Sequence, residues 1–214
     1  MKNNIELILT DIGGVIYKST GMKNAISSFL NQDSKSETVQ RIIDIFMDSF
    51  IGVISEEQFW NMISIITNKS AEEVYKIIEF FDYTINYEFL NYLKELSKEC
   101  KIGIISDINS VIYKIIKNNI NDFECIFDKN YIFLSYIEQD SKYLSGSKFF
   151  DNILNKINIK NNRILFIDDK IENVSSARKS RILALQYIKT ENEEKDNQKI
   201  ISEINEVLSR NKYE

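Results

Sequence analysis

The stretch Ile5-Glu-Leu-Ile-Leu-Thr-Asp-Ile-Gly-Gly14 decides the fold class of this chain. Residues 5–10 form a short, mostly apolar run that ends at Asp11 and a pair of glycines. Such a run, bounded by turn residues, is typical of a strand that is buried on both faces, as in a parallel sheet. We therefore expect the first strand of a parallel sheet to end at Asp11.

Two later segments repeat this pattern. Residues 101–106 read Lys-Ile-Gly-Ile-Ile-Ser and lead into Asp107, and residues 163–168 read Arg-Ile-Leu-Phe-Ile-Asp and lead into Asp169. Further strands are expected at residues 125–128, 131–134 and 182–187, and helices at residues 88–98, 109–119, 149–157 and 172–179 and near the C-terminus. Strands and helices that alternate over short links predict an α/β fold with a Rossmann-like, doubly wound parallel sheet.

Residues 22–81 differ from the rest because their apolar residues follow the helical period without any strand pattern. Two helix starts carry capping boxes, Ser55 with Gln58 and Ser70 with Glu73. We expect an inserted all-helical lobe. The predicted division is a core of residues 1–16 and 87–214 and a helical cap of residues 17–86.

The composition excludes several classes of protein. The chain has no histidine, which excludes Ser-His triads, Cys-His dyads and zinc sites that use histidine. A net charge of −5 argues against nucleic acid as a partner. The N-terminal region lacks a long apolar run, so we expect a cytoplasmic protein without a membrane partner. Cys100 and Cys125 are too few for a disulfide framework, and both are expected to be buried thiols.

The polar residues that follow the three clearest strands suggest a site. Ligands of an open parallel sheet bind at the carboxyl ends of its strands, where Asp11, Ser106, Asp107, Asp168 and Asp169 are expected. Converging carboxylates suit a hard cation such as Mg²⁺. A single aspartate at a strand end is an ordinary turn or cap residue, but four in register favour a site.

Four segments resemble the motifs of the haloacid dehalogenase (HAD) superfamily, in the order and at the spacing of that family. They are Leu9-Thr-Asp-Ile-Gly-Gly-Val-Ile16, Ile104-Ile-Ser-Asp107, Lys142 and Phe166-Ile-Asp-Asp-Lys-Ile-Glu-Asn173. The resemblance covers residues 5 to about 188. The insertion resembles the helical cap of the subgroup that contains sugar-phosphate phosphatases and beta-phosphoglucomutases. Within it, residues 52–59 are similar to a cap segment of glucose-1-phosphate-type phosphatases.

The resemblance implies a magnesium-dependent phosphatase that acts on a small phosphorylated metabolite. Asp11 would attack phosphorus and form an aspartyl-phosphate, with Ser106 and Lys142 as the other catalytic residues. The implied ligands of Mg²⁺ are Asp11, the backbone carbonyl of Gly13, Asp168 and, as the favoured direct ligand, Asp169. The implied substrate-binding residues are Gly13, Gly14, Ser106, Asp107, Asn109 and Lys142. Asn173 is expected to cap or orient the loop of the fourth motif, and the protein to be a monomer or a homodimer.

The sequence departs from the family pattern at Gly13, where phosphatases usually carry a second aspartate that acts as general acid and base. Such help is typically worth about 10²–10⁴ in rate. Tyr143 and Arg181 stand where proline and glycine are usual, and Arg181 is expected where a left-handed residue often ends a helix. A cap carboxylate, Glu56 or Glu57, could enter the site, although a charge at a helix start is the simpler interpretation.

Two other functions remain open at this stage. Gly13 and the aromatic residues within 80–89 are compatible with a catalytically weak relative that binds a phosphorylated ligand or a protein partner. A 2-haloacid dehalogenase uses the same nucleophile without Mg²⁺ and also lacks the second aspartate. The Asp168-Asp169 pair argues against it because the pair resembles a metal site. The sequence does not identify the substrate, since fold analogy cannot supply it.

Overall fold

The computed structural model describes residues 5–18, 21–81 and 83–213 of the chain. Five parallel strands form one sheet in the order β3-β2-β1-β4-β5. They are β1 (Leu7–Thr10), β2 (Lys101–Ser106), β3 (Ile132–Leu134), β4 (Ile164–Asp168) and β5 (Leu183–Gln186). This sheet confirms the predicted fold class. The expected core and cap together include residues 1–4, 19, 20, 82 and 214, which lie outside the described residues.

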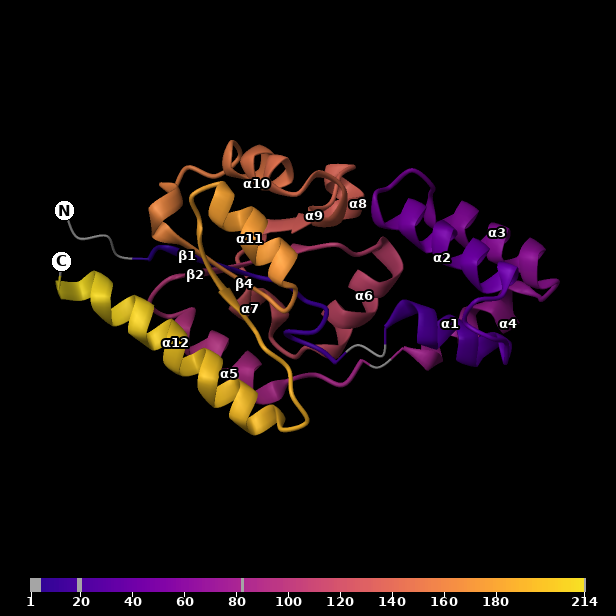
Figure 1. Ribbon diagram of the computed structural model, residues 1–214, viewed down its shortest axis with the longest axis horizontal. Helices are drawn as coiled ribbons and strands as arrows, with labels where there is room; N and C mark the ends of the chain where they lie inside the picture. The colour runs from indigo at the N-terminus through magenta and orange to yellow at the C-terminus, as the bar shows by residue number, and fades with distance from the viewer. Residues whose placement is uncertain (1–4, 19–20, 82, 214) are drawn as a thin grey trace.

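Helices cover both faces of the sheet, so the sheet is doubly wound (Figure 1). One face packs against α5 (Tyr87–Leu96), α6 (Ser110–Asn119), α7 (Phe123–Ile126) and α12 (Glu193–Tyr213). The other face packs against α10 (Ser147–Leu154) and α11 (Ile171–Lys179). Short helices, namely η2 (Lys129–Tyr131), α8 (Ser135–Glu138), α9 (Lys142–Ser145) and η3 (Asn161–Arg163), complete the connections.

Alternating side chains of the central strands build two apolar cores. In β1, Leu7 and Leu9 join the core under α10 and α11, whereas Ile8 joins the core on the other face. In β4, Phe166 and Leu165 divide in the same way. Successive side chains of a strand point to opposite faces, so a continuous apolar run fills both cores. Each of these runs ends in polar residues that are themselves buried, such as Asp11 and Asp168.

The region between β1 and α5 contains only helices among its described residues, and Figure 1 shows them grouped beyond one end of the sheet. They are α1 (Met22–Leu30), α2 (Glu37–Phe50), α3 (Glu56–Thr67), α4 (Ala71–Tyr75) and η1 (Lys76–Phe80). Both predicted capping boxes are present, at the starts of α3 and α4. We call residues 22–80 of this region the cap.

Polar contacts and one close backbone approach dock the cap on the core. The Asn109 amide donates a hydrogen bond to the Ser49 hydroxyl at 3.0 Å. Glu56 pairs with Lys114 at 2.7 Å, and its carboxylate also accepts a hydrogen bond from a serine of α6. Gly52 lies so close to α8 that a Cβ on it would meet the carbonyl oxygen of Tyr136 at 2.4 Å. Glu56 therefore faces α6 of the core, whereas a simple helix-start charge would face solvent.

The structure corrects two predictions. Residues 125–128 are not a strand, because α7 occupies residues 123–126, and Phe123, Ile126 and Phe127 are buried at helical spacing. A short apolar run of this kind fits a strand and a helix equally well by periodicity. The cysteines are not both buried: Cys125 is exposed on α7, and Cys100 is only partly buried. Arg181 adopts the expected left-handed conformation, with φ of 63°.

No helix within residues 5–18, 21–81 and 83–213 combines the length and the apolar character that crossing a membrane requires.

Candidate active site

The sheet brings the carboxyl ends of three strands together. β1 lies between β2 and β4, and Thr10 is in register with Ile104 on one side and Ile167 on the other. Asp11 follows Thr10, so its carboxylate lies beside Ser106 at the end of β2 and Asp168 at the end of β4. The Ser106 hydroxyl hydrogen bonds to the Asp11 carboxylate. Parallel pairing thus assembles the predicted site at one edge of the sheet.

Lys142 lies in the middle of this site. Its ammonium is buried and contacts the Asp11 carboxylate at 2.9 Å and the Asp168 carboxylate at 2.6 Å. It also donates to the backbone carbonyl of Ile105 at 3.2 Å. An ammonium has three donors, so all three are used. A lysine outside such a site is usually a solvated surface charge. Lys142, by contrast, is buried.

Asp107 positions Lys142 through the backbone. Its carboxylate accepts the N–H of Lys142 at 3.0 Å and the N–H of Tyr143 at 3.2 Å, at the start of α9. Ser141 caps the same helix by accepting the N–H of Leu144. Tyr143 stands where the family has proline, which has no N–H to give. The departure at Tyr143 therefore adds one of the bonds that anchor α9.

Asp168 is held by several donors. Its carboxylate accepts the backbone N–H of Lys170 at 2.8 Å and hydrogen bonds at 3.1 and 3.0 Å from the Asn173 amide, in addition to Lys142. Asn173 therefore orients the fourth-motif loop, as expected. Burial raises the pKa of the Asp168 carboxyl to about 6 against the opposing charge of Lys142, and the Asp11 carboxylate adds to the rise.

Asp169 is the carboxylate with an unused oxygen. Its Oδ2 pairs with Lys189 at 2.7 Å, whereas its Oδ1 is buried without a hydrogen-bond partner among the described residues. Ligand atoms of Asp11, Asp168 and Asp169 lie within 4.8 Å of one another, so the group could hold a metal ion. Buried polar atoms normally have partners, and hard oxygen ligands suit Mg²⁺. The donor set therefore fits that cation.

The charges around Asp11 keep the carboxyl ionised. Burial alone would raise the pKa of Asp11, but the Lys142 ammonium and hydrogen bonds from Ser106, Lys142 and the Ile12 N–H outweigh it, so the pKa lies below its usual value. Burial would lower the pKa of Lys142, but the surrounding carboxylates, Asp11 first, raise it. Asp11 is thus an anion beside a cation, which is the state that a nucleophilic carboxylate needs.

The other predicted residues have different surroundings. Gly14 has φ of 80°, and a Cβ there would meet Asp169 Oδ2 at 2.3 Å, so the position requires glycine. Asn109 is buried and caps α6 by accepting the N–H of Ile112, while its amide bonds to the cap. The roles of Gly13, Gly14, Asp107 and Asn109 in binding a substrate stay predictions.

Sequence reasoning missed two residues of the site. Lys189 follows β5 and pairs with Asp169, and nothing in its local pattern marks it. Tyr17 lies four residues after Gly13, and its hydroxyl would be 3.4 Å from a Cβ at that glycine. Only the spacing from the first motif could have singled out Tyr17.

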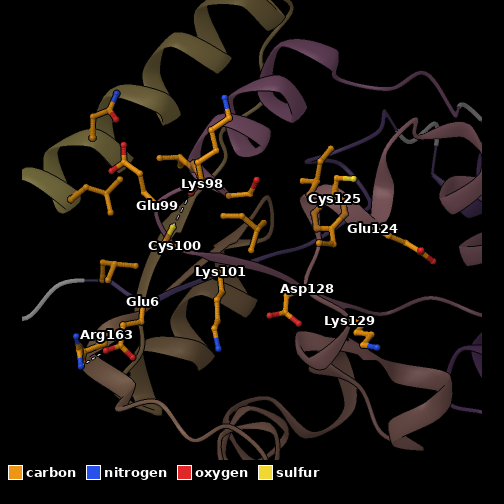
Figure 2. A pocket seen from close by; sticks show the side chains of 18 of the residues that line it. Glu6, Lys98, Glu99, Cys100, Lys101, Glu124, Cys125, Asp128, Lys129 and Arg163 are labelled. Atoms are coloured by element: carbon orange, nitrogen blue, oxygen red, sulfur yellow. Dashed lines mark hydrogen bonds and ion pairs between the residues drawn. The ribbon is translucent and has the colours of Figure 1, made fainter.

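A separate hollow lies at the end of the sheet opposite the carboxylate cluster, where the strands begin. It encloses about 1460 Å³, and Glu6, Cys100, Lys101, Cys125 and Arg163 are among its lining residues (Figure 2). Arg163 pairs with Glu6, and Lys101 donates to the Tyr131 hydroxyl at 3.0 Å, so these charges are satisfied within the protein. The hollow is wide and its charges are of both signs. The carboxylate cluster at the other end of the strands is therefore the better candidate for an active site.

Comparisons with known proteins identify the fold. A HAD-family enzyme of Bacteroides thetaiotaomicron, solved in complex with magnesium and inorganic phosphate, is 22% identical, with a TM-score of 0.75 over 88% of this chain and 97% of that one. A predicted HAD-like family hydrolase of Porphyromonas gingivalis is 21% identical, with a TM-score of 0.74 over 92% and 98%. The 2-haloacid dehalogenase of Pseudomonas syringae pv. tomato is 13% identical, with a TM-score of 0.60 over 96% and 99%.

The chain therefore has the fold of the HAD-family hydrolases, with an α/β core and a helical insertion. No family model matches the sequence, and no curated protein matches it.

Proposed function

We propose that this protein is a magnesium-dependent phosphatase that releases phosphate from a small phosphorylated metabolite through an aspartyl-phosphate on Asp11. The observation that carries the proposal is the buried cluster in which Lys142 joins Asp11 to Asp168 while Asp169 keeps a free oxygen. A structural neighbour solved with magnesium and inorganic phosphate supports it.

Asp11 is suited to attack phosphorus because it is ionised and fixed. Its Oδ1 accepts the backbone N–H of Ile12 at 2.8 Å, and its Oδ2 faces Lys142. A held carboxylate loses little freedom when it reacts, which is how positioning lowers a barrier. The bond to Asp11 forms as the bond to the leaving oxygen breaks, and water then attacks the aspartyl-phosphate and restores the carboxylate.

Lys142 and Ser106 would stabilise the transferring group. The ammonium of Lys142 supplies a fixed positive charge, and the Ser106 hydroxyl is a hydrogen-bond donor at the same strand edge. Preorganised donors of this kind stabilise developing negative charge without reorganisation. Mg²⁺, held by Asp169, Asp11, Asp168 and the Gly13 carbonyl, would neutralise charge on the phosphoryl group.

The test is phosphate release from sugar phosphates, nucleotides, acyl phosphates and p-nitrophenyl phosphate, with Mg²⁺ or with EDTA. We expect turnover that EDTA abolishes and that Asp11→Asn reduces at least about a thousandfold, as loss of a nucleophile does. Asp151→Asn, an exposed aspartate of α10, is the matched control and should keep the wild-type rate.

Two outcomes would contradict the proposal. Chloride release from 2-haloacids that survives EDTA would favour a dehalogenase, in line with the likeness to dehalogenases of known structure. Tight binding of phosphorylated ligands without turnover would favour a catalytically silent relative.

A further inference from the structure

Gly13 has no side chain, and the phenol group of Tyr17 lies in the space beside it. A Cβ on Gly13 would lie 3.4 Å from the hydroxyl oxygen of Tyr17 and 3.7 Å from the ring carbon that bears it. Apart from Gly13 and its two chain neighbours, no atom of the described residues lies closer to that Cβ position. The phenol end of Tyr17 therefore stands next to the place that an acidic side chain at residue 13 would occupy.

The local backbone fixes Tyr17 there. The N–H of Gly14 donates to the Tyr17 carbonyl at 2.8 Å, and the N–H of Tyr17 donates to the Ile12 carbonyl at 3.2 Å. Bridges pair Tyr17 with Gly13 on one side and with Ile85 on the other. The chain thus turns back on itself directly after Asp11, and the turn returns Tyr17 to the site.

The Tyr17 hydroxyl lies beside Gly13, close enough to Asp11 and Asp169 for their charges to act on it. Burial first, and then the charge of Asp11, raise the pKa of Tyr17, with smaller contributions from Tyr83 and Asp169. A phenol has an ordinary pKa of about 10, so it is protonated near neutral pH and can donate a hydrogen bond. Among residues 5–18, 21–81 and 83–213 the Tyr17 hydroxyl has no hydrogen-bond partner.

We propose that Tyr17 is a catalytic residue that donates a hydrogen bond to the leaving-group oxygen, in place of the acid missing at Gly13. This inference rests on the proposed phosphatase function. The bond between Asp11 and phosphorus forms, the bond from phosphorus to the leaving oxygen breaks, and that oxygen departs with the electron pair. Tyr17 keeps its proton and stabilises the anion by hydrogen bonding, so the substrate class is phosphates with weakly basic leaving groups, such as acyl phosphates.

The experiment measures kcat/KM for a series of substituted phenyl phosphates, which differ in leaving-group basicity but little in shape. In Tyr17→Phe we expect a fall of about 100-fold for phenyl phosphate, at the lower end of the range for a lost donor to a developing anion, and little change for 2,4-dinitrophenyl phosphate. The plot of log kcat/KM against leaving-group pKa should become steeper. A merely structural role would lower all substrates equally.

Tyr83→Phe is the matched control. Tyr83 packs near Tyr17, with ring centroids 6.0 Å apart and the rings tilted by 43°, and its hydroxyl is buried without a partner among the described residues. Its loss should leave the slope unchanged. Gly13→Asp added to Tyr17→Phe should restore part of the phenyl phosphate rate, because phenylalanine lacks the oxygen nearest that Cβ position.

Failure of the role of Tyr17 and failure of the phosphatase function would give different results. Wild-type turnover with the same slope in Tyr17→Phe would overturn the role of Tyr17 and leave the phosphatase function standing. No phosphate release by the wild type from any substrate would overturn the proposed function and the role of Tyr17 with it.

Discussion

Lys142 carries a positive charge in the interior of the protein, where the surrounding carboxylates supply the opposing charge. Asp11 and Asp168 share this one ammonium, while Asp169 pairs with Lys189. The cluster therefore has one more negative charge than positive charges. Burying such a group is costly unless every charge is matched, which explains why a divalent cation suits the site.

Replacing Lys142 tests this balance directly. In the absence of metal, Lys142→Met should lower the free energy of unfolding by about 3 to 5 kcal/mol, because two buried carboxylates lose their partner. Urea unfolding measures the change. Lys98→Met, which removes an exposed pair with Glu95, should change the free energy by less than about 0.5 kcal/mol. A loss below about 1 kcal/mol for Lys142→Met would contradict the charge balance described here.

Loops between elements decide how the cap meets the core. The loop from α2 to α3 carries Gly52, which has φ of 68° and lies against the Tyr136 carbonyl of α8. No L-residue fits this position well, because both the backbone conformation and the space are wrong. Ser55, three residues later, fixes the start of α3 with a complete capping box. The sequence of this short loop therefore sets the orientation of two cap helices on the core.

Gly52→Ala should loosen this junction. We expect faster amide hydrogen exchange in α8 and in the last turn of α2, together with a loss of stability of roughly 1–3 kcal/mol from overpacking and strain. Hydrogen exchange followed by mass spectrometry locates the effect. Gly21→Ala is the control for strain alone, because Gly21 also has a positive φ but no atom lies within 4 Å of its added Cβ. Unchanged exchange in α8 would rule out the contact as a docking point.

Metal binding at the proposed site stabilises the fold as a unit. Asp11, Asp168 and Asp169 come from β1 and from the end of β4, which pair at the centre of the sheet. A ligand that binds only the folded state stabilises it according to its concentration and affinity. Because its ligands follow two paired central strands, the bound ion would stabilise the centre of the sheet.

At Mg²⁺ concentrations one hundred times the dissociation constant, the fold should gain about 2.7 kcal/mol. For a chain of this size that corresponds to a rise in Tm of roughly 5 to 10 °C. Differential scanning calorimetry should show the rise in the wild type and in Asp151→Asn. The rise should be largely absent in Asp169→Asn, which alters the unpartnered oxygen. An equal rise in all three proteins would place the ion elsewhere.

Local pattern alone was enough to predict the strands that end at Thr10, Ser106 and Asp168, the helical insertion and both capping boxes, because each depends on periodicity or on residues three apart. It failed at α7, where four residues fit a helix and a strand equally well. The strand-end pattern also predicted that Asp11, Ser106, Asp168 and Asp169 meet at one edge of the sheet. Lys142 was predicted only from the resemblance to the HAD superfamily.

Only the tertiary structure decided how these residues are charged and held. Lys142 meets Asp11 across 131 positions of the chain, and Lys189 meets Asp169 because the register of β5 places it there. The hydroxyl of Tyr17 lies beside Gly13 because the chain loops round at Gly14 and brings Tyr17 back alongside Gly13 in a parallel bridge. Residue types and spacing determine which groups are present, but burial and distance determine their protonation and their partners, and these arise only when the sheet and the cap are packed together.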